Sequence, residues 1–167
     1  MKHPHSILSM LLLVVALAAC QQKVTTADAV AYNDGIVDVQ TRVVDHFDRF
    51  VDAVDAYDSL GALRALDVAL DTASHCQKRL DAMPGFEGKT ELRDAAKNLV
   101  QLYARGLDHD FREILPVLVS HGASLAQLER ADSIRAVFSQ EEDRLFGMIV
   151  KAQEDFSKTY QFEVVAR

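Results

Sequence analysis

Apolar residues return at every third or fourth position from Tyr32 onward, a spacing that places them on one face of an α-helix rather than on one side of a strand. We predict a first helix over residues 26–57, with Thr26 as its N-cap because its hydroxyl can accept a hydrogen bond from a first-turn amide. Asp28 suits the positive end of the helix dipole. The inward face consists of Tyr32, Ile36, Val39, Val43, Phe47, Phe50, Val54 and Tyr57.

The same periodicity continues in a second stretch without losing phase, and residues 58–61 are the only break between the two. A tight turn is favoured there, since Ser59 can cap a new helix, Gly61 relaxes the backbone, and a single helix of roughly 58 residues is unusual in a small domain. One uninterrupted helix is the alternative. The second apolar stripe consists of Leu60, Leu63, Leu66, Leu70, Ala73, Cys76, Leu80 and Met83.

Proline and glycine mark the two remaining turns. Residues 83–88 contain one proline and two glycines, which predicts a chain reversal before a third helix that begins near Thr90. Pro116 should kink or end this helix, residues 120–122 form the next turn, and a fourth helix follows over residues 124–162. The inward residues are Leu92, Ala96, Leu99, Tyr103, Leu107, Phe111, Ile114 and Leu118, then Leu125, Leu128, Val137, Phe138, Leu145, Met148, Ile149, Ala152, Phe156 and Tyr160.

Four amphipathic helices joined by short turns predict an all-α fold, an antiparallel up-down four-helix bundle over residues 26–167. Gly35, Gly106 and Gly147 lie inside the predicted helices, where each costs about 1 kcal/mol relative to alanine. Close contact between helices is the favoured explanation of these glycines, and a functional cavity is the alternative.

The first twenty residues carry a different pattern. Lys2 precedes an apolar run that is shorter than the roughly 20 apolar residues needed to cross a bilayer, as in an export signal. The run ends in Leu-Ala-Ala-Cys, which resembles the lipobox of bacterial lipoproteins. This resemblance implies that residues 1–19 are a cleaved lipoprotein signal peptide, that a lipidated Cys20 anchors the chain to the membrane, and that residues 20–25 include the tether. Gln21 in place of Asp implies the outer membrane of the cell envelope.

Charge excludes one class of partner. The chain has 18 basic and 25 acidic residues, and removal of residues 1–19 takes away only one of the basic residues, Lys2. We therefore expect no nucleic-acid partner, because binding to phosphates needs a basic surface. Cys76 is the only thiol left after lipidation, so no intrachain disulfide is expected. Its place within the apolar stripe predicts an inert, buried side chain.

Motifs for catalysis and for cofactors are missing from the sequence. It contains no Glu-x-x-His, Cys-x-x-Cys-His or His-Glu-x-x-His and no glycine-rich phosphate loop, so we expect no catalytic residue, no cofactor and no metal site. His46, His75, His109 and His121 lie on different segments, and we expect surface or locally hydrogen-bonded side chains without a partner one helical turn away. A shared transition-metal or haem site is the alternative.

One stripe of carboxylates lies on the first predicted helix, beside its apolar face. Ca²⁺ or Mg²⁺ is one hypothesis for it, because hard cations bind several carboxylate oxygens, and a basic partner is another. The favoured interpretation is a solvated surface, with ion pairs between Asp38 and Arg42 and between Asp45 and Arg49. The stripe consists of Asp45, Asp48, Asp52 and Asp55.

The lipobox, followed after a short spacer by Tyr-Asn-Asp-Gly-Ile-Val at residues 32–37 and by a helical remainder, resembles a group of bacterial surface or envelope lipoproteins with an all-helical mature domain. The resemblance implies fold and location but brings no functional residue with it. We expect a noncatalytic envelope lipoprotein that acts as an interaction or structural module with an envelope protein partner.

A sensor for a small ligand or a metal is the alternative function. Its pocket would be opened by Gly106 or Gly147, with Tyr103, His109 or His75 nearby.

Overall fold

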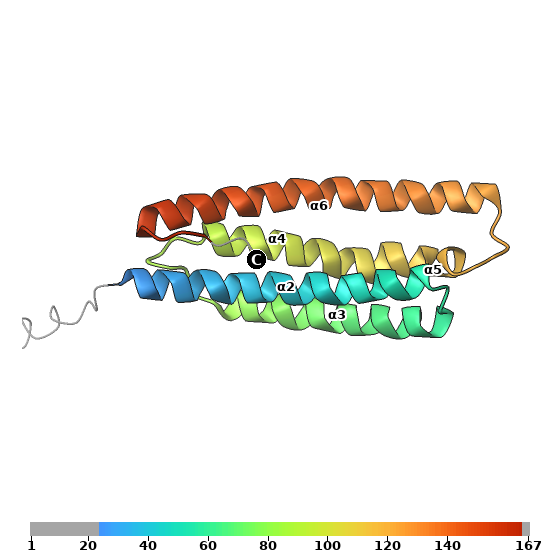
Figure 1. The fold of residues 1–167 in the computed structure, drawn as a ribbon, viewed down its shortest axis with the longest axis horizontal. Helices are drawn as coiled ribbons and strands as arrows, with labels where there is room; N and C mark the ends of the chain where they lie inside the picture. Colours follow the sequence, from blue (N-terminus) through green and yellow to red (C-terminus); the bar gives the residue numbers. More distant parts are fainter. Residues whose placement is uncertain (1–23, 165–167) are drawn as a thin grey trace, which may run out of the picture.

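The computed structural model describes residues 24–164, so the predicted signal peptide and Cys20 lie outside the described residues. The described chain forms four antiparallel rods, which confirms the all-α, up-down arrangement (Figure 1). None of the described helices combines the length and apolar character needed to cross a bilayer. The rods are α2 (Thr26–Asp55), α3 (Ser59–Ala82), the continuous series α4 (Glu91–Arg105), η2 (Gly106–Phe111) and α5 (Arg112–Leu118), and α6 (Leu125–Tyr160).

Both predicted N-caps of the first two helices are wrong by one residue. Thr25, not Thr26, caps α2, and it forms a capping box in which its hydroxyl accepts from the Asp28 amide while the Asp28 carboxylate accepts from the Thr25 amide. Asp58, not Ser59, caps α3 by accepting from the Gly61 amide at 2.9 Å. The predicted turn itself is confirmed, and the uninterrupted helix is wrong, because Tyr57 adopts a φ of +54° between α2 and α3.

The third rod contains a π-helix, η2, that the sequence analysis does not predict. The rod continues through Pro116 and ends at Leu118, two residues beyond the proline. Proline tends to stop a helix by removing one amide donor and crowding the carbonyl four residues earlier, at Arg112. That carbonyl belongs to the first residue of α5, directly after η2. The wider π-helical turn and the proline are therefore adjacent irregularities in one rod.

The rods do not form a square bundle. α2 packs mainly on α3, α4 packs on α3 and α6 and less on α2, and α6 packs mainly on α4 (Figure 1). As a result α6 is buried along one narrow stripe, and several residues predicted to face inward are exposed because no neighbouring rod covers them. They are Leu60 and Leu63 on α3 and Leu125, Leu128, Val137 and Met148 on α6; Tyr57, at the turn, is also exposed.

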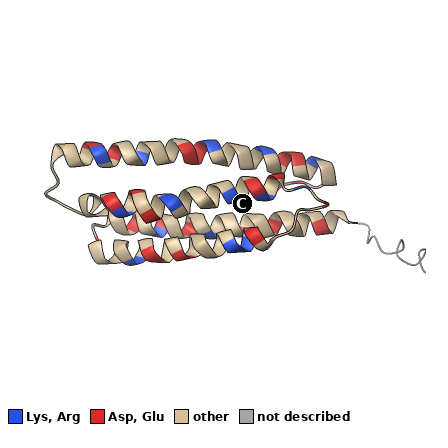
Figure 2. Ribbon diagram, turned by 180° about the vertical axis from the view of Figure 1, so that it is seen from behind, with Lys and Arg blue, Asp and Glu red and all other residues tan. Residues whose placement is uncertain are grey.

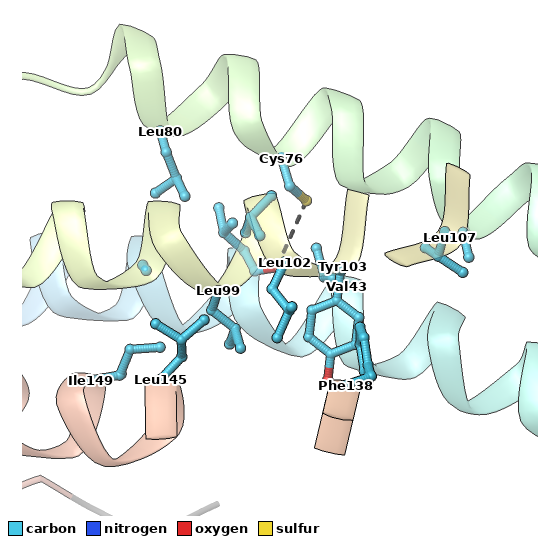
Figure 3. Packing of buried hydrophobic residues seen from close by; sticks show 14 of the residues in the cluster. Val43, Cys76, Leu80, Leu99, Leu102, Tyr103, Leu107, Phe138, Leu145 and Ile149 are labelled. Carbon is cyan, nitrogen blue, oxygen red and sulfur yellow. Dashed lines mark hydrogen bonds between the residues drawn. The ribbon is translucent and has the colours of Figure 1, made fainter. Parts of the chain in front are cut away.

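The buried side chains of the rods pack into one core, part of which Figure 3 shows around Leu99 and Tyr103. The core and the side chains packed against it include two aromatic clusters. The distal cluster lies in the half of the bundle near the α2–α3 turn and comprises Phe47, Phe50, Tyr103, Phe111 and Phe138. The proximal cluster lies at the end where α2 begins and comprises Tyr32, Phe86, Phe156, Tyr160 and Phe162. Ten of the 12 aromatic residues thus lie in these two clusters. Each cluster combines residues that are far apart in the sequence.

Candidate functional site

A groove of about 580 Å³ lies between α4 and α6 at the proximal end of the bundle, and we call it the α4–α6 groove. Its volume lies in the range of small-molecule sites in proteins. Its apolar surface comes from three helices, and charged and polar residues surround it. The lining residues are Tyr32 of α2; Lys89, Glu91, Leu92, Asp94, Ala95 and Asn98 in and before α4; and Met148, Lys151, Ala152, Asp155, Phe156, Thr159 and Tyr160 of α6.

Small residues on the two facing helices leave room for the groove. Leu92 and Ala95 lie three positions apart on α4, and Ala152 and Phe156 lie four positions apart on α6, so each pair shares one helix face. Two of these four side chains are alanines. The short side chains of Ala95 and Ala152 therefore take up little of the space between α4 and α6 at the groove.

Three residues of the proximal aromatic cluster, Tyr32, Phe156 and Tyr160, line the groove. The Tyr32 ring lies 5.2 Å from the Phe86 ring and 5.6 Å from the Phe156 ring, centroid to centroid. Phe86 reaches the cluster through a tight turn, in which Phe86 and Lys89 exchange two backbone hydrogen bonds of 2.8 and 2.9 Å. Both central residues of that turn have positive φ, and at Gly88 the value is +80°. The same turn places Lys89 at the mouth, with its ammonium group 5.2 Å from the centre of the Tyr160 ring.

The charges around the groove are mostly paired. Lys151 binds Asp155 at 2.8 Å, and their hydrogen bond lowers the pKa of the Asp155 carboxyl and raises the pKa of the Lys151 amine. Asp94 accepts from the Arg93 guanidinium at 2.8 Å. Burial opposes ionisation of Asp94, but hydrogen bonds from Thr90 and Arg93 outweigh it and hold its pKa below the ordinary value.

Two tyrosines at the groove differ in their hydrogen bonding. Tyr160 donates to the Glu87 carboxylate at 2.9 Å, and burial together with this bond raises the pKa of Tyr160 to about 12. The Tyr32 hydroxyl is buried and has no hydrogen-bond partner among the described residues. Burial raises the pKa of Tyr32 as well. A buried hydroxyl without a hydrogen-bond partner lowers the stability of the fold by about 1–3 kcal/mol, so the Tyr32 hydroxyl is destabilising where it lies.

Residues 32–37 lie in the second and third turns of α2, beside this site. Asn33 is buried and accepts a 2.9 Å hydrogen bond from the Gln153 amide of α6. Ile36 enters the core, and Gly35 lies 3.7 Å, measured from an added Cβ, from the end of the Met83 side chain. The segment thus ties α2 to α6 and supplies Tyr32 to the α4–α6 groove.

Neither Gly106 nor Gly147, the glycines expected to open a pocket, lines the α4–α6 groove, although Met148, next to Gly147, does. A Cβ on Gly106 would lie 2.6 Å from Phe138, so this glycine permits close packing, whereas a Cβ on Gly147 would meet no atom within 4 Å. Tyr103 is buried in the distal cluster and donates to the Glu142 carboxylate. His75 and His109 are exposed on the surface and do not join Tyr103.

Tyr103 makes unfolding sensitive to alkaline pH. Burial and the hydrogen bond to Glu142 raise the pKa of Tyr103 well above its ordinary value of 10.0. Its contribution to stability is complete below pH 10 and falls as the pH rises from 10 toward the folded-state pKa, because only the unfolded chain ionises. We expect this residue to contribute a loss approaching about 1.4 kcal/mol per pH unit above pH 10. The decrease should therefore be smaller in Tyr103→Phe, where Tyr32 and Tyr160, whose pKa values are also raised, still contribute. Urea unfolding between pH 8 and 11 measures it, with Tyr57→Phe as control; parallel curves for wild type and Tyr103→Phe would contradict it.

The histidines are separate from one another, and one prediction about them is wrong. His75 has a partner one turn away: its Nδ1 lies 2.9 Å from the Asp71 carbonyl oxygen and 3.5 Å from the Asp71 carboxylate. His109 lies 3.5 Å from Asp108, and the His121 ring stacks on Tyr57 at 4.6 Å. Within residues 24–164, no three His, Cys, Asp or Glu side chains gather in a way that could hold a metal ion.

The carboxylate stripe of α2, consisting of Asp45, Asp48, Asp52 and Asp55, is exposed along its length. Acidic and basic residues alternate over the rods rather than separate into faces (Figure 2). The predicted pair between Asp38 and Arg42 forms at 3.1 Å, and Arg79 of α3 joins it. The predicted pair between Asp45 and Arg49 is wrong, since no such contact occurs within 4.0 Å in the described structure.

Cys76 is buried, as predicted, and its thiol faces the Val39 carbonyl oxygen at 3.7 Å (Figure 3). Burial raises the pKa of the Cys76 thiol. Because the thiolate is the reactive form, both the burial and the raised pKa disfavour reaction at this residue.

Sequence reasoning missed the α4–α6 groove because its residues carry ordinary core signals. Tyr32, Leu92 and Phe156 each lie in an apolar stripe, and only the fold brings them together from three helices. Gly88, in the turn before α4, is the one local signal of the site in the sequence. It predicts a chain reversal between Phe86 and Lys89 but not where these two side chains lie. Comparison of the chain with protein-family models, with curated proteins and with solved structures gives no match.

Proposed function

We propose that the chain is a noncatalytic, lipid-anchored protein of the bacterial envelope whose helical bundle binds a small molecule in the α4–α6 groove. The observation that carries the proposal is the groove itself, an apolar recess of about 580 Å³ built on three rigid helices. The groove lies at the end of the bundle where α2 begins. The first residue of α2, Thr26, comes six residues after Cys20. Six extended residues span roughly 20 Å, so an anchor at Cys20 would keep the groove close to the membrane.

Two features of the groove favour binding over catalysis. General acid-base catalysis at neutral pH uses groups whose pKa values approach neutrality. At the groove the pKa values are shifted away from neutrality. Those of Asp94 and Asp155 are lowered. That of Lys151 is raised, and that of Tyr160 is raised to about 12. The carboxylates and the lysine are also engaged in ion pairs. These side chains are therefore suited to shape and close a recess.

Filling the groove tests the proposed function. Ala152→Phe adds a ring on the α6 wall, and we expect it to weaken binding of the neutral fluorescent probe N-phenyl-1-naphthylamine at least tenfold, since it occupies the probe's space. Val150→Phe places the same ring two residues away on an exposed part of α6 and is the matched control. Fluorescence titration of the purified mature domain measures both. Saturable binding that survives in Ala152→Phe, or no binding in wild type, would contradict the proposal.

The anchor is tested separately. If Cys20 carries acyl chains, mass spectrometry of the protein extracted from membranes finds an N-terminal Cys20 with lipid mass added, and Cys20→Ser leaves the protein with its signal peptide attached or free of the membrane. An unmodified Cys20 in membrane-extracted protein would contradict the anchor without touching the groove.

A second candidate function is contact with an envelope protein through α6. Leu125 and Val137 are 73% and 66% exposed, although both are large apolar side chains. A photoreactive residue at Val137 would then form an adduct with one defined partner in intact cells, whereas the same residue at the exposed Ser139, on the other side of α6, would form less of it. Equal labelling from both positions would argue against a specific interface.

A further inference from the structure

A second recess, of about 440 Å³, lies between α2 and α6 in the distal half of the bundle, and we call it the α2–α6 recess. It shares no lining residue with the α4–α6 groove. We propose that it is a docking site for a basic amphipathic helix of another protein, which lays its apolar face in the recess and its lysines or arginines beside the carboxylate stripe of α2. The lining residues are Phe47 and Val51 of α2; Phe111 of η2; and Asp132, Arg135, Ala136, Phe138, Ser139 and Glu142 of α6.

The recess is open because α6 packs mainly on α4 and makes few contacts with α2. On this side α2 carries four apolar side chains spaced three or four residues apart, so they follow one face of the helix. All four are half-buried and packed against the core, and two of them, Phe47 and Val51, line the recess. A further helix laid along them would cover the part that remains exposed, as amphipathic helices do in apolar grooves. The four are Val44, Phe47, Val51 and Val54.

The carboxylate stripe of α2 follows this apolar row position by position, because each of the four apolar residues directly precedes one of its aspartates. Adjacent helix positions differ by about 100°, so the stripe borders the row over a length of about 15 Å. All four carboxylates are exposed, and none lies within 4.0 Å of a basic nitrogen among the described residues. Arg49 follows Asp48 and lies on the side of the stripe away from the recess. By contrast, Asp38, nearer the start of α2, is bound by Arg42 and Arg79.

The α6 side of the recess adds a further carboxylate. Glu142 lines the recess and accepts a hydrogen bond from the buried Tyr103 hydroxyl, which holds the carboxylate at this wall. In the described part of the chain it too has no basic nitrogen within 4.0 Å. Arg135 is the basic residue of the lining, and its guanidinium lies 3.8 Å from the Asp132 carboxylate. Carboxylates therefore outnumber basic groups on both sides of the recess, which favours a partner with basic side chains.

The extent of the carboxylate stripe distinguishes between possible occupants. A second copy of this chain would bring the same excess of acidic residues, 25 against 18 basic ones, and like charges placed opposite each other oppose binding. A small organic cation would meet one carboxylate and leave most of the stripe uncovered. A basic amphipathic helix fits both features, because its apolar residues repeat along the recess and its long basic side chains extend beside it to the aspartates.

The closing experiment measures binding of three fluorescein-labelled peptides to the mature chain by fluorescence anisotropy. Each has about 14 residues, long enough as a helix to cover the stripe. The first is made of leucine and lysine with the leucines on one helical face, the second has glutamate in place of lysine, and the third has the composition of the first in shuffled order. We expect the first peptide to bind at least tenfold tighter than the other two. If it does not bind, or if the shuffled peptide binds as tightly, the inference is wrong.

A substitution in the recess tests the place of binding. Ala136→Phe fills the recess from an exposed position, and we expect it to weaken binding of the leucine–lysine peptide at least tenfold. Val137→Phe, about 100° further round α6, is the matched control and should bind as wild type does. Equal affinities in the two variants would contradict docking in the recess. Analytical ultracentrifugation without peptide checks the other occupant: a dimer that Ala136→Phe dissociates would assign this surface to a second copy and overturn the proposal.

A second pair of variants tests the charges. Asp48→Asn combined with Asp52→Asn removes two carboxylates of the stripe and should weaken binding of the same peptide about fivefold at low salt. Asp67→Asn combined with Asp71→Asn removes the same charge at the same spacing from the exposed surface of α3 and should change the affinity less than about twofold. If both double variants weaken binding equally, the peptide senses only the overall acidity of the chain and the inference is wrong.

Discussion

Replacing Phe138 with alanine is expected to destabilise the domain by about 3–5 kcal/mol, because it empties the centre of the distal aromatic cluster. The Phe138 ring is 5% exposed and lies 4.9 Å from the Phe111 ring, 5.4 Å from the Phe47 ring and 5.6 Å from the Tyr103 ring. Phe138 and Ala131 are the buried residues in the first half of α6. Urea unfolding measures the loss, and thermal unfolding should show a decrease in Tm of roughly 10 °C.

The neighbouring residue provides the control. Val137 is 66% exposed, so Val137→Ala removes two methyl groups that little covers, and its effect should stay within about 0.5 kcal/mol. Equal losses in the two variants would mean that α6 is rotated relative to the structure described here, because adjacent positions on a helix face directions about 100° apart.

Val137 and Phe138 also show which buried positions the spacing of apolar residues predicts correctly and which it does not. The pattern predicts four rods, the turns between them and most of the buried positions of α2 and α4, because those rods have neighbours on several sides. It places both Val137 and Phe138 in the interior, and only Phe138 is there. Spacing identifies apolar faces, but it does not count the helices that cover them, and α6 lies against fewer neighbours than a square bundle would give it.

The site is less predictable than the fold for a related reason. A glycine inside a helix is compatible with either close packing or a cavity, and the sequence analysis favours packing; Gly106 confirms this by its approach to Phe138. Tyr32 carries no comparable signal, because a tyrosine in an apolar stripe resembles any other core residue. Its special feature is a hydroxyl without a partner, and that depends on which atoms Phe86 and Phe156 place around it.

The second large effect is expected at Gly106. A methyl group there would lie 2.6 and 2.9 Å from two atoms of the Phe138 ring, which its neighbours hold in place. Gly106→Ala should therefore cost about 1–3 kcal/mol through overpacking, although alanine is the better helix former. Gly147→Ala meets open space on exposed α6 and should instead stabilise the domain by up to about 1 kcal/mol. Urea unfolding of both variants checks the opposite signs.

The clash can be distinguished from any other effect of the methyl group by a double variant. In a Phe138→Ala background the ring that Gly106 approaches is gone, so Gly106→Ala should change from destabilising to neutral or stabilising, and the two substitutions should be strongly non-additive. If Gly106→Ala costs the same in both backgrounds, the glycine is required by the π-helix itself rather than by the contact with α6. Reversal of the sign would establish that η2 and α6 are fitted to each other through this single pair of residues.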